Sequence, residues 1–514
     1  MIEQTFILSP EQAKEMEQTY RVVRRSVDAR QRKLHVMLSL LCDEHGKIVP
    51  RDAAIPLYEP PRFRDIHSHK KGEVMIVGMG PAGLFAALRL LEDGYQPILI
   101  ERGKAISDRK QDIARLNRNE GIDTESNYCF GEGGAGTFSD GKLFSRSKKR
   151  GSMQRVMEWF HYFGADDTVL YETHAHIGSD RLPAIIRSMR ERIIACGGEV
   201  HFSTLLDSSL WNELNKKQIP TILAIGHSAH DTYRLLAREG VQLEAKGCAM
   251  GVRVEHPQQL IDRLMYHLQS ASQAEVEHIV ELLGHASYSL VTQVRNMRNT
   301  LSSADTRGVY SFCMCPGGHI VPAGTELNGC VVNGMSNSQR NSPYANSGMV
   351  VSLLPSDYAP YEKEGALSGL CLQEELEHLA ASHGRLPNIA PAQRLTDFVE
   401  GKSSADLPSC SYLPGIVSSR LDEWLPVVIG NSLREGFRIF GRKYAGYLTR
   451  EAVVVGVESR SSSPVRINRD AATMQSLSHP WLYPAGEGAG YAGGITSSAL
   501  DGIRAAEAII ASNQ

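Results

Sequence analysis

The sequence lacks an uncharged apolar run of about 18 residues, the length that a membrane-spanning helix needs. Its start, MIEQTFILSPEQAKEMEQ, has neither the basic nor the apolar stretch of a secretory signal peptide. It also lacks the dense, even cysteine framework of a secreted disulfide scaffold, since nine cysteines are scattered over 514 residues. These absences predict a soluble, cytoplasmic protein with reduced thiols and no membrane partner.

The sequence also lacks an excess of positive charge. Its net charge is −3 at pH 7, whereas nucleic-acid binders usually carry a basic domain or face. The main basic cluster, Arg146 to Arg150, is interpreted as a solvated loop, so we expect no nucleic-acid partner. With 42% apolar and 22% charged residues, the composition is that of an ordinary globular protein. At roughly 150 residues per domain, the chain should contain two to four domains.

A small N-terminal α+β unit is predicted for residues 1–70. Pro56, Pro60 and Pro61 near its end favour an extended linker, because proline interrupts helices and sheets. The elements expected within this unit are a strand around Phe6–Leu8, a helix over Pro10–Val27 and a strand over Leu34–Leu41.

From Glu73 onward the pattern becomes strand, glycine turn, helix and strand, which is typical of a parallel sheet. Residues 71–245 and 451–514 are therefore predicted to form one Rossmann-like domain. Short alternating runs predict that residues 246–450 form an inserted substrate domain, with an antiparallel sheet followed by helices from about 365. The expected fold class is α/β. Further strands of the parallel sheet are expected at Glu199–Thr204 and Thr221–Ile225.

A dinucleotide-binding fingerprint follows the first apolar strand, in VMIVGMGPAGLFAALRLLEDGYQPILIERG. Gly78 permits a tight turn, Gly80 lets the backbone approach a pyrophosphate, and Gly83 lets the helix pack on the strand. Pro81 suits the first helical turn, whose free N–H groups and positive dipole end point at the phosphates. Glu101 ends the second strand, where its carboxylate can accept the ribose hydroxyls. A glycine turn that binds nothing is the alternative, but the strand, helix and acid together favour a dinucleotide.

The loop Phe130–Leu143 is a second glycine-rich segment. It has enough free backbone to surround a second phosphate or the edge of a flavin. A flexible surface loop is the alternative, which Phe130 and Phe138 among the glycines make less attractive. The cofactor-binding candidates in this loop are Gly136, Thr137, Ser139, Gly141 and Lys142.

The C-terminal segment LYPAGEGAGYAGGITSSALDGIRAAEAII distinguishes between dinucleotides. Its last apolar residues recur at helical spacing, with Thr496 or Ser497 as the cap and two glycines directly before the helix. A helix N-terminus in that position could stabilise negative charge on a reduced flavin, which an NAD-only dehydrogenase does not need.

These segments, together with NYCFGEGGAGTFSDGKL, AMGVRVEHP, VYSFCMCPGG and GVESRSSSPVRI, resemble the glutathione-reductase-type FAD superfamily and, more narrowly, a family of bacterial FAD-dependent dehydrogenases. The resemblance spans most of the chain and implies FAD, a mixed-sheet second domain and redox chemistry. It implies that Gly78, Gly80, Ala82, Gly83, Glu101 and Arg102 bind the ADP part, Leu206 and Gly226 flank the adenine, Gly486 and Glu487 bind the pyrophosphate and ribitol, and Gly494, Ile495 and Thr496 lie near the isoalloxazine. Glu487 departs from the aspartate that is commonest at its position.

Candidates for the chemistry are Cys313, Cys315 and Arg460. A two-residue spacing on a strand would place both thiols on one face, as a redox pair or an electron relay. The alternative is that both are small buried residues, and the CxxxxC of the disulfide reductases is absent. Arg460 could pair with a substrate carboxylate or the reduced flavin, with a structural salt bridge as the alternative. Arg253 and His256 could face the same cleft.

The histidine pairs His174/His176 and His227/His230 have no cysteine or carboxylate at zinc-type spacing around them. We therefore expect satisfied polar residues there and no metal.

The function predicted is an FAD-dependent oxidoreductase that transfers a hydride between flavin N5 and a small organic substrate. Only one strand-linked GxGxxG occurs, so any NAD(P)H would have to bind transiently. Two other classes stay open: a flavin-dependent RNA-modifying enzyme, and a redox-sensing flavoprotein that binds a partner with little turnover.

Overall fold

A small antiparallel sheet with strand order β1-β3-β2 begins the chain. The computed structural model describes residues 2–30, 33–144, 151–295, 306–385 and 388–512. The expected helix over Pro10–Val27 is too long, because the chain is extended at Tyr20 and the valine-rich segment after it pairs with β3. The elements of this unit are β1 (Ile2–Leu8), α1 (Pro10–Thr19), β2 (Val22–Asp28) and β3 (His35–Cys42).

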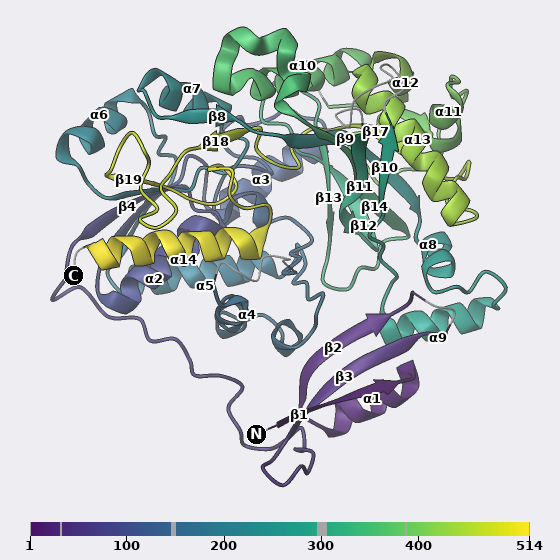
Figure 1. The fold of residues 1–514 in the computed structure, drawn as a ribbon, viewed down its shortest axis with the longest axis horizontal. Coiled ribbons are helices and arrows are strands. Elements are labelled where there is room, and N and C mark those ends of the chain that lie inside the picture. The colour runs from purple at the N-terminus through teal and green to yellow at the C-terminus, as the bar shows by residue number, and fades with distance from the viewer. Residues whose placement is uncertain (1, 31–32, 145–150, 296–305, 386–387, 513–514) are drawn as a thin grey trace.

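A five-stranded parallel sheet with order β19-β7-β4-β5-β6 forms the second part. Helices α2 and α14 lie side by side against it (Figure 1). A Cβ on Gly502 would stand 2.0 Å from the Ala82 carbonyl oxygen, so the two helices approach closely only because glycine is there. The strands are β4 (Glu73–Val77), β5 (Gln96–Ile100), β6 (Glu199–His201), β7 (Thr221–Leu223) and β19 (Leu482–Pro484). The helices are α2 (Pro81–Asp93), α3 (Ile106–Asn117), α4 (Met153–Tyr162), α5 (Leu182–Ala195), α6 (Ser208–Lys217), α7 (His230–Arg238) and α14 (Ile495–Ser512).

The third part is a seven-stranded sheet with order β10-β11-β14-β9-β17-β15-β16. Its neighbours are antiparallel except β15 and β16. Helix α13 packs across β10, β11, β14 and β9 (Figure 1). The strands are β9 (Cys248–Pro257), β10 (Val291–Arg295), β11 (Thr306–Cys315), β14 (Tyr344–Leu353), β15 (Ala390–Arg394), β16 (Ile416–Ser418) and β17 (Val453–Glu458). The helices are α8 (Gln258–Met265), α9 (Gln273–Leu283), α10 (Ser368–His383), α11 (Leu395–Glu400), α12 (Leu421–Trp424) and α13 (Val427–Lys443). Two small ladders, β12 (Gly318–Pro322) with β13 (Val332–Ser336) and β8 (Leu243–Ala245) with β18 (Val465–Ile467), complete the strands.

Strand β17 differs from its expected place in the 451–514 segment of the Rossmann-like domain. It pairs with β9 on one side and β15 on the other, so it belongs to the seven-stranded sheet. All six of its residues, VVVGVE, are buried, as suits a strand with neighbours on both sides. The mainly helical pattern expected for 365–450 holds for α10 to α13, but that region also contains β15 and β16.

The N-terminal sheet contacts both larger parts. On one side, Arg25 N donates to Tyr171 O at 2.8 Å, and Arg25 O accepts from Thr173 N at 2.9 Å. On the other, α1 packs on α9, with Lys14 Nζ 3.2 Å from Glu281 Oε1. Within the described ranges no helix is long and apolar enough to cross a membrane. The basic run Arg146 to Arg150 lies outside the described residues.

Candidate functional site

One large cavity, about 2010 Å³ in volume, lies where the two larger parts of the chain meet. Its walls include the turn before α2, the loop 128–142, the N-terminus of α14 and the end of β11. Ligand pockets usually measure roughly 300–1,000 Å³. This cavity therefore has room for more than one ligand.

The turn before α2 has the geometry expected of the fingerprint. Gly78 has a φ of +99°, and a Cβ there would stand 2.3 Å from the Ala224 carbonyl oxygen, so no side chain fits. Gly80 is the N-cap and provides no side-chain cap, and Pro81 stands in the first turn. Helix α2 thus turns free N–H groups and its positive dipole end toward the cavity. Gly83 lies away from the cavity, where a Cβ would meet the Gly78 carbonyl oxygen at 2.0 Å.

Glu101 is buried at the cavity wall and also ties two loops together. Its carboxylate accepts hydrogen bonds from the backbone N–H groups of Met79 (2.9 Å), Gly103 (3.0 Å) and Gly131 (2.9 Å). A carboxylate offers about four acceptor positions, so one stays free for a ribose hydroxyl. Arg102 beside it is held by Glu125 and Asp231 and lies 4.2 Å over the Phe130 ring, so it forms part of the wall rather than a free cation.

Arg109, which the sequence analysis missed, holds the loop that follows. It is fully buried on α3, and its guanidinium donates to four main-chain oxygens and to the Thr137 hydroxyl. Thr137 is itself buried and does not line the cavity, so its expected contact with a cofactor is replaced by this bond. The four carbonyl groups belong to Asn127, Tyr128, Glu132 and Gly134. Only the fold reveals Arg109, since in sequence it is one of several charged residues of a polar helix.

The remaining candidates of this loop lie at the cavity. Lys142 Nζ donates to the Met314 carbonyl group, and this bond joins the loop to the end of β11. The same Nζ lies 3.5 Å from Asp140. Ser139 Oγ donates to Gly136 O at 2.8 Å and accepts from Gly141 N at 3.1 Å. These four candidates therefore line the cavity, with Ser139 fixing the turn itself.

The N-terminus of α14 closes another side of the cavity. Thr496 Oγ1 donates to Leu143 O at 2.7 Å, which fixes the helix start against the loop 128–142. A Cβ on Gly494 would meet no atom within 4 Å, so this position is open to the cavity. The Gly486 N–H donates to Asp501 Oδ2 at 2.9 Å, and Asp501 is paired with Arg469 at 2.7 Å. The buried pair was missed, although an aspartate within the apolar pattern of α14 was a usable signal.

Glu487 stands in the same loop as Gly486, and its Oε2 lies 2.8 Å from His227 Nδ1. Both side chains line the cavity, beside Gly226 and across from Leu206. His227 thus fixes the orientation of the carboxylate that the sequence analysis assigned to the ribitol. Glu487 is longer than the aspartate that is commonest at this position, and His227 holds its side chain in place.

Cys313 and Cys315 both line the cavity, but not through the strand alternation that was expected. A β-bulge between Phe312 and Cys315, with a left-handed φ of +45° at Cys313, interrupts that alternation. Cys313 is the more exposed residue, and the Sγ of the buried Cys315 lies 3.6 Å from Arg253 Nη2. Burial raises the pKa of both thiols, that of Cys313 to about 12, which disfavours a reactive thiolate.

Arg460, Arg253 and His256 each have a structural partner. Arg460 lines the cavity, and its guanidinium forms a buried two-point ion pair with Glu377, at 2.8 and 2.6 Å, as the structural alternative expects. Arg253 is paired with Glu458 at 2.7 Å. His256 lies on the other side of β9, with Nε2 2.9 Å from Tyr447 O, because residues three apart on a strand face opposite ways.

The histidine pairs lie in different surroundings. Burial lowers the pKa of His176 to about 4, so the ring is neutral at pH 7, and its Nε2 lies 3.2 Å from Ser338 O. The His174 ring contacts the Phe144 ring in a tilted arrangement, with centroids 4.6 Å apart. His230 is buried beside Glu326 and Glu374, two carboxylates that local sequence spacing could not reveal.

Comparison with known proteins finds a matching family model and a similar full-length protein. Residues 247–461 match the family described as "FAD-dependent protein, C-terminal domain-like". The chain is 38% identical over 512 residues to a protein of Clostridium beijerinckii described as uncharacterized, covering 95% of this chain and 92% of that one.

Solved structures are more distant. CtdE in complex with FAD is 10% identical, with 85% of this chain and 83% of that chain covered and a TM-score of 0.27. The 3-ketosteroid-delta4-(5alpha)-dehydrogenase from Rhodococcus jostii RHA1, in complex with 4-androstene-3,17-dione, is 10% identical, with 89% and 100% covered and a TM-score of 0.31. Scores this low carry no argument about this chain.

FAD is the cofactor, as the sequence predicts. The residues present fit it, because the uncapped N-terminus of α2 offers N–H groups to a pyrophosphate and Glu101 offers an acceptor to a ribose. Gly226 and Gly494 leave space into which any side chain would project.

Proposed function

The chain belongs to the same family as its Clostridium beijerinckii relative. Because residues 247–461 match a family of FAD-dependent proteins, we propose that it is an FAD-dependent oxidoreductase acting on a small organic substrate. We further propose a Rossmann-like FAD-binding domain built on the parallel sheet, with the seven-stranded sheet as the substrate domain. In this assignment the FAD domain resumes after β17, near residue 459, instead of at 451.

The observation that carries this proposal is the extent of the cavity. Its lining extends beyond the glycine loops to residues outside the fingerprint, and we name the part of the cavity that these residues line the second chamber. The chamber walls come from the end of β2, from the segment after α8 and from the end of α13. They include Ala29, Tyr266, Tyr288, Ser289 and Lys443. An aromatic and polar chamber continuous with a cofactor site is what a second, reacting molecule requires.

Bound FAD supplies a hydride acceptor or donor at N5. The N–H groups of α2 would bind its pyrophosphate, and the N-terminus of α14 would stabilise negative charge on its flavin. Lys142 adds a cation to the cavity wall, held by Asp140 and the Met314 carbonyl group. His176 stays neutral at pH 7, so it adds no positive charge to this wall. The bulge at Cys313 shapes the part of the wall that comes from the end of β11.

NAD(P)H is proposed as a transient electron donor that binds in the second chamber, since the chain has one dinucleotide fingerprint. The test is anaerobic mixing of the FAD-loaded protein with NADH or NADPH, followed by absorbance in the visible flavin bands. We expect one of them to bleach the flavin, and a substrate from an oxidant panel to restore the colour.

A substitution in the second chamber separates turnover from cofactor binding. Ser289 is exposed and lines this chamber, so Ser289→Trp should fill it while FAD stays bound. The matched control is Ser289→Ala, which leaves the space open. If Ser289→Trp turns over at the rate of Ser289→Ala, the second chamber is not the substrate site.

A further inference from the structure

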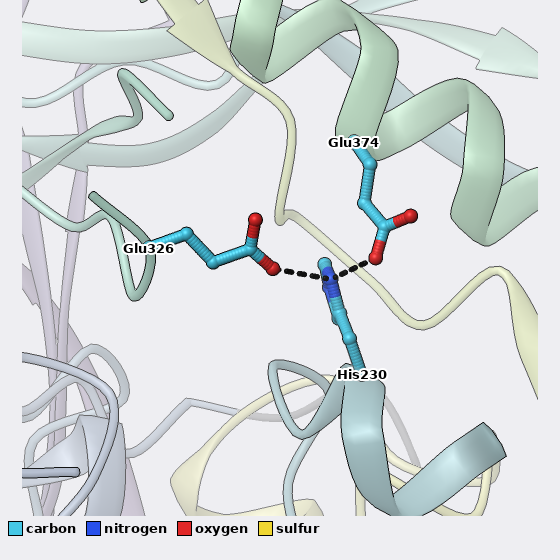
Figure 2. A group of neighbouring side chains, drawn as sticks. All are labelled: His230, Glu326 and Glu374. Carbon is cyan, nitrogen blue, oxygen red and sulfur yellow. Dashed lines mark hydrogen bonds and ion pairs between the residues drawn. The ribbon is translucent and has the colours of Figure 1, made fainter. Parts of the chain in front are cut away.

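Three side chains outside the cavity converge at the junction of the two larger parts (Figure 2). His230 is the first residue of α7, Glu326 lies in the connection between β12 and β13, and Glu374 is on α10. One ligand atom from each lies within 4.8 Å of the other two. The group therefore joins the parallel-sheet part to elements of the seven-stranded part.

The separations in this group lie on either side of the edge length of a metal coordination shell. His230 Nδ1 is 3.0 Å from Glu374 Oε1 and 3.7 Å from Glu326 Oε1. Zinc-to-nitrogen and zinc-to-oxygen bonds of about 2.0–2.2 Å in a tetrahedron put neighbouring ligand atoms about 3.3–3.6 Å apart. Shifts of a few tenths of an ångström in the two carboxylates would therefore place all three ligand atoms around one ion.

The charges around the group leave one carboxylate without a full counter-charge. Glu374 Oε2 forms an ion pair with Arg234 at 2.6 Å, and Glu374 Oε1 faces His230. The nearby Arg460 is engaged by Glu377. Glu326 meets only imidazoles among the described residues, with His378 Nε2 3.5 Å from its Oε2.

His230 itself is suited to be a ligand. Its side chain is only 4% exposed, and Nε2 has no hydrogen-bond partner among the described residues. A single proton on Nδ1 can form a hydrogen bond with one of the two carboxylates, whereas a cation between the carboxylates would bind both. The carboxylates are more open, at 39% and 15% exposed for Glu326 and Glu374, so an ion could reach the group from solvent.

We propose that His230, Glu326 and Glu374 form a site for a divalent transition-metal ion such as Zn²⁺ or Mn²⁺. One imidazole and two carboxylates suit these ions, and water or a rotated His378 completes the shell. The ion cross-links α7 and α10. Since α7 begins directly after Ala229, which lines the cavity, the ion also braces the cavity wall from behind.

The test is isothermal titration of the FAD-loaded protein, after treatment with a chelator, with ZnCl₂ and separately with MnCl₂. We expect one ion per chain and a thermal unfolding midpoint that rises by several degrees with metal, because the ion binds the folded state. Glu326→Gln and Glu374→Gln keep the side-chain shape and should each weaken binding at least tenfold, as should His230→Gln. Retention of FAD checks that each variant is folded.

Glu375→Gln is the matched control, because Glu375 lies next to Glu374 on α10 but outside the group. It should bind metal as the wild type does. Failure of the wild type to bind either ion overturns the proposal and leaves an ion-pair cluster around a protonated His230. Binding that is unchanged in His230→Gln and Glu326→Gln also overturns it, because the ion then sits elsewhere.

Discussion

The seven-stranded sheet and the loop 127–137 of the parallel part differ in how a buried arginine beside them is neutralised. Arg253 on β9 and Arg460 directly after β17 are each paired with a buried carboxylate, Glu458 and Glu377. Arg109, which lies against the loop, is bonded to four main-chain oxygens and one hydroxyl, and among the described residues no ion pair joins it to a carboxylate. Burial lowers its pKa to about 10, which still leaves it charged at pH 7.

The difference separates two uses of buried charge. A guanidinium matched by a carboxylate holds elements of a sheet together, and its charge is cancelled locally. A guanidinium matched only by carbonyl groups fixes a loop in one conformation. Arg109 fixes the loop 127–137, and that loop contacts the phosphate turn, since a Cβ on Gly134 would stand 3.1 Å from the Gly80 Cα.

Arg109→Met should give the largest effect. It removes the five hydrogen bonds of the guanidinium, and only the Glu132 and Gly134 carbonyl groups keep another donor, the hydroxyl and the N–H of Thr137. We therefore expect a loss of about 4 kcal/mol in unfolding free energy, measured by urea denaturation. The loop also loses its fixed shape, so FAD should dissociate more readily. Arg109→Lys keeps the charge but not the geometry, and should retain part of the stability. Equal stability of Arg109→Met and the wild type would refute the role given to this residue.

Glu377→Gln should cost about 3 to 5 kcal/mol, because it leaves the Arg460 charge buried without a partner. The double variant Glu377→Leu with Arg460→Met should recover most of this loss, as measured by chemical denaturation. If the Arg460–Glu377 ion pair has only a structural role, the double variant should still turn over substrate. If it folds and binds FAD but does not turn over, Arg460 acts in catalysis as the sequence first suggested.

The pH dependence of stability tests His256, in the core of the seven-stranded part. Burial lowers its pKa to about 4, whereas the unfolded chain takes up a proton near pH 6.5. Between these values the unfolded state binds more protons, so stability falls as pH drops from about 6.5 to 4. We expect His256 to account for about 2 to 3 kcal/mol of that loss. A His256→Gln variant should show a flatter curve, and an unchanged slope would contradict this assignment.

Cys313→Gly should give the smallest effect and the opposite sign. A left-handed backbone costs a residue other than glycine about 1–2 kcal/mol, part of which the flexibility of glycine in the unfolded chain offsets. We expect a gain of up to about 1 kcal/mol. The control is Cys315→Gly, which removes a buried side chain and should destabilise. Loss of stability in both variants would show that Cys313 has a packing role.

The parallel part could be predicted from sequence because its site depends on one contiguous motif. Gly78, Gly80 and Pro81 lie where the fingerprint expects them, since the strand, turn and helix are adjacent along the chain. The close approach of Gly83 to the Gly78 carbonyl group was predictable for the same reason.

The seven-stranded part could not be predicted in the same way, because its contacts join segments far apart in sequence. The bulge at Cys313 depends on the register of β11 against β14, and no local pattern announces it. Arg460 meets Glu377 only after α10 packs beside β17. The group around His230 likewise comes from three distant segments, so local spacing could not reveal that these side chains meet.

The most direct test of the central claim, that FAD lies in the cavity with its flavin ring at the N-terminus of α14, compares FAD and ADP binding. Gly494→Leu adds a side chain at the proposed flavin end, whereas Gly80→Val adds one at the phosphate turn. We expect Gly494→Leu to lower FAD affinity at least tenfold, about 1.4 kcal/mol, and to leave ADP affinity unchanged. We expect Gly80→Val to lower both affinities. Unchanged FAD affinity in Gly494→Leu, or an equal loss of FAD and ADP affinity, would contradict the placement of the flavin.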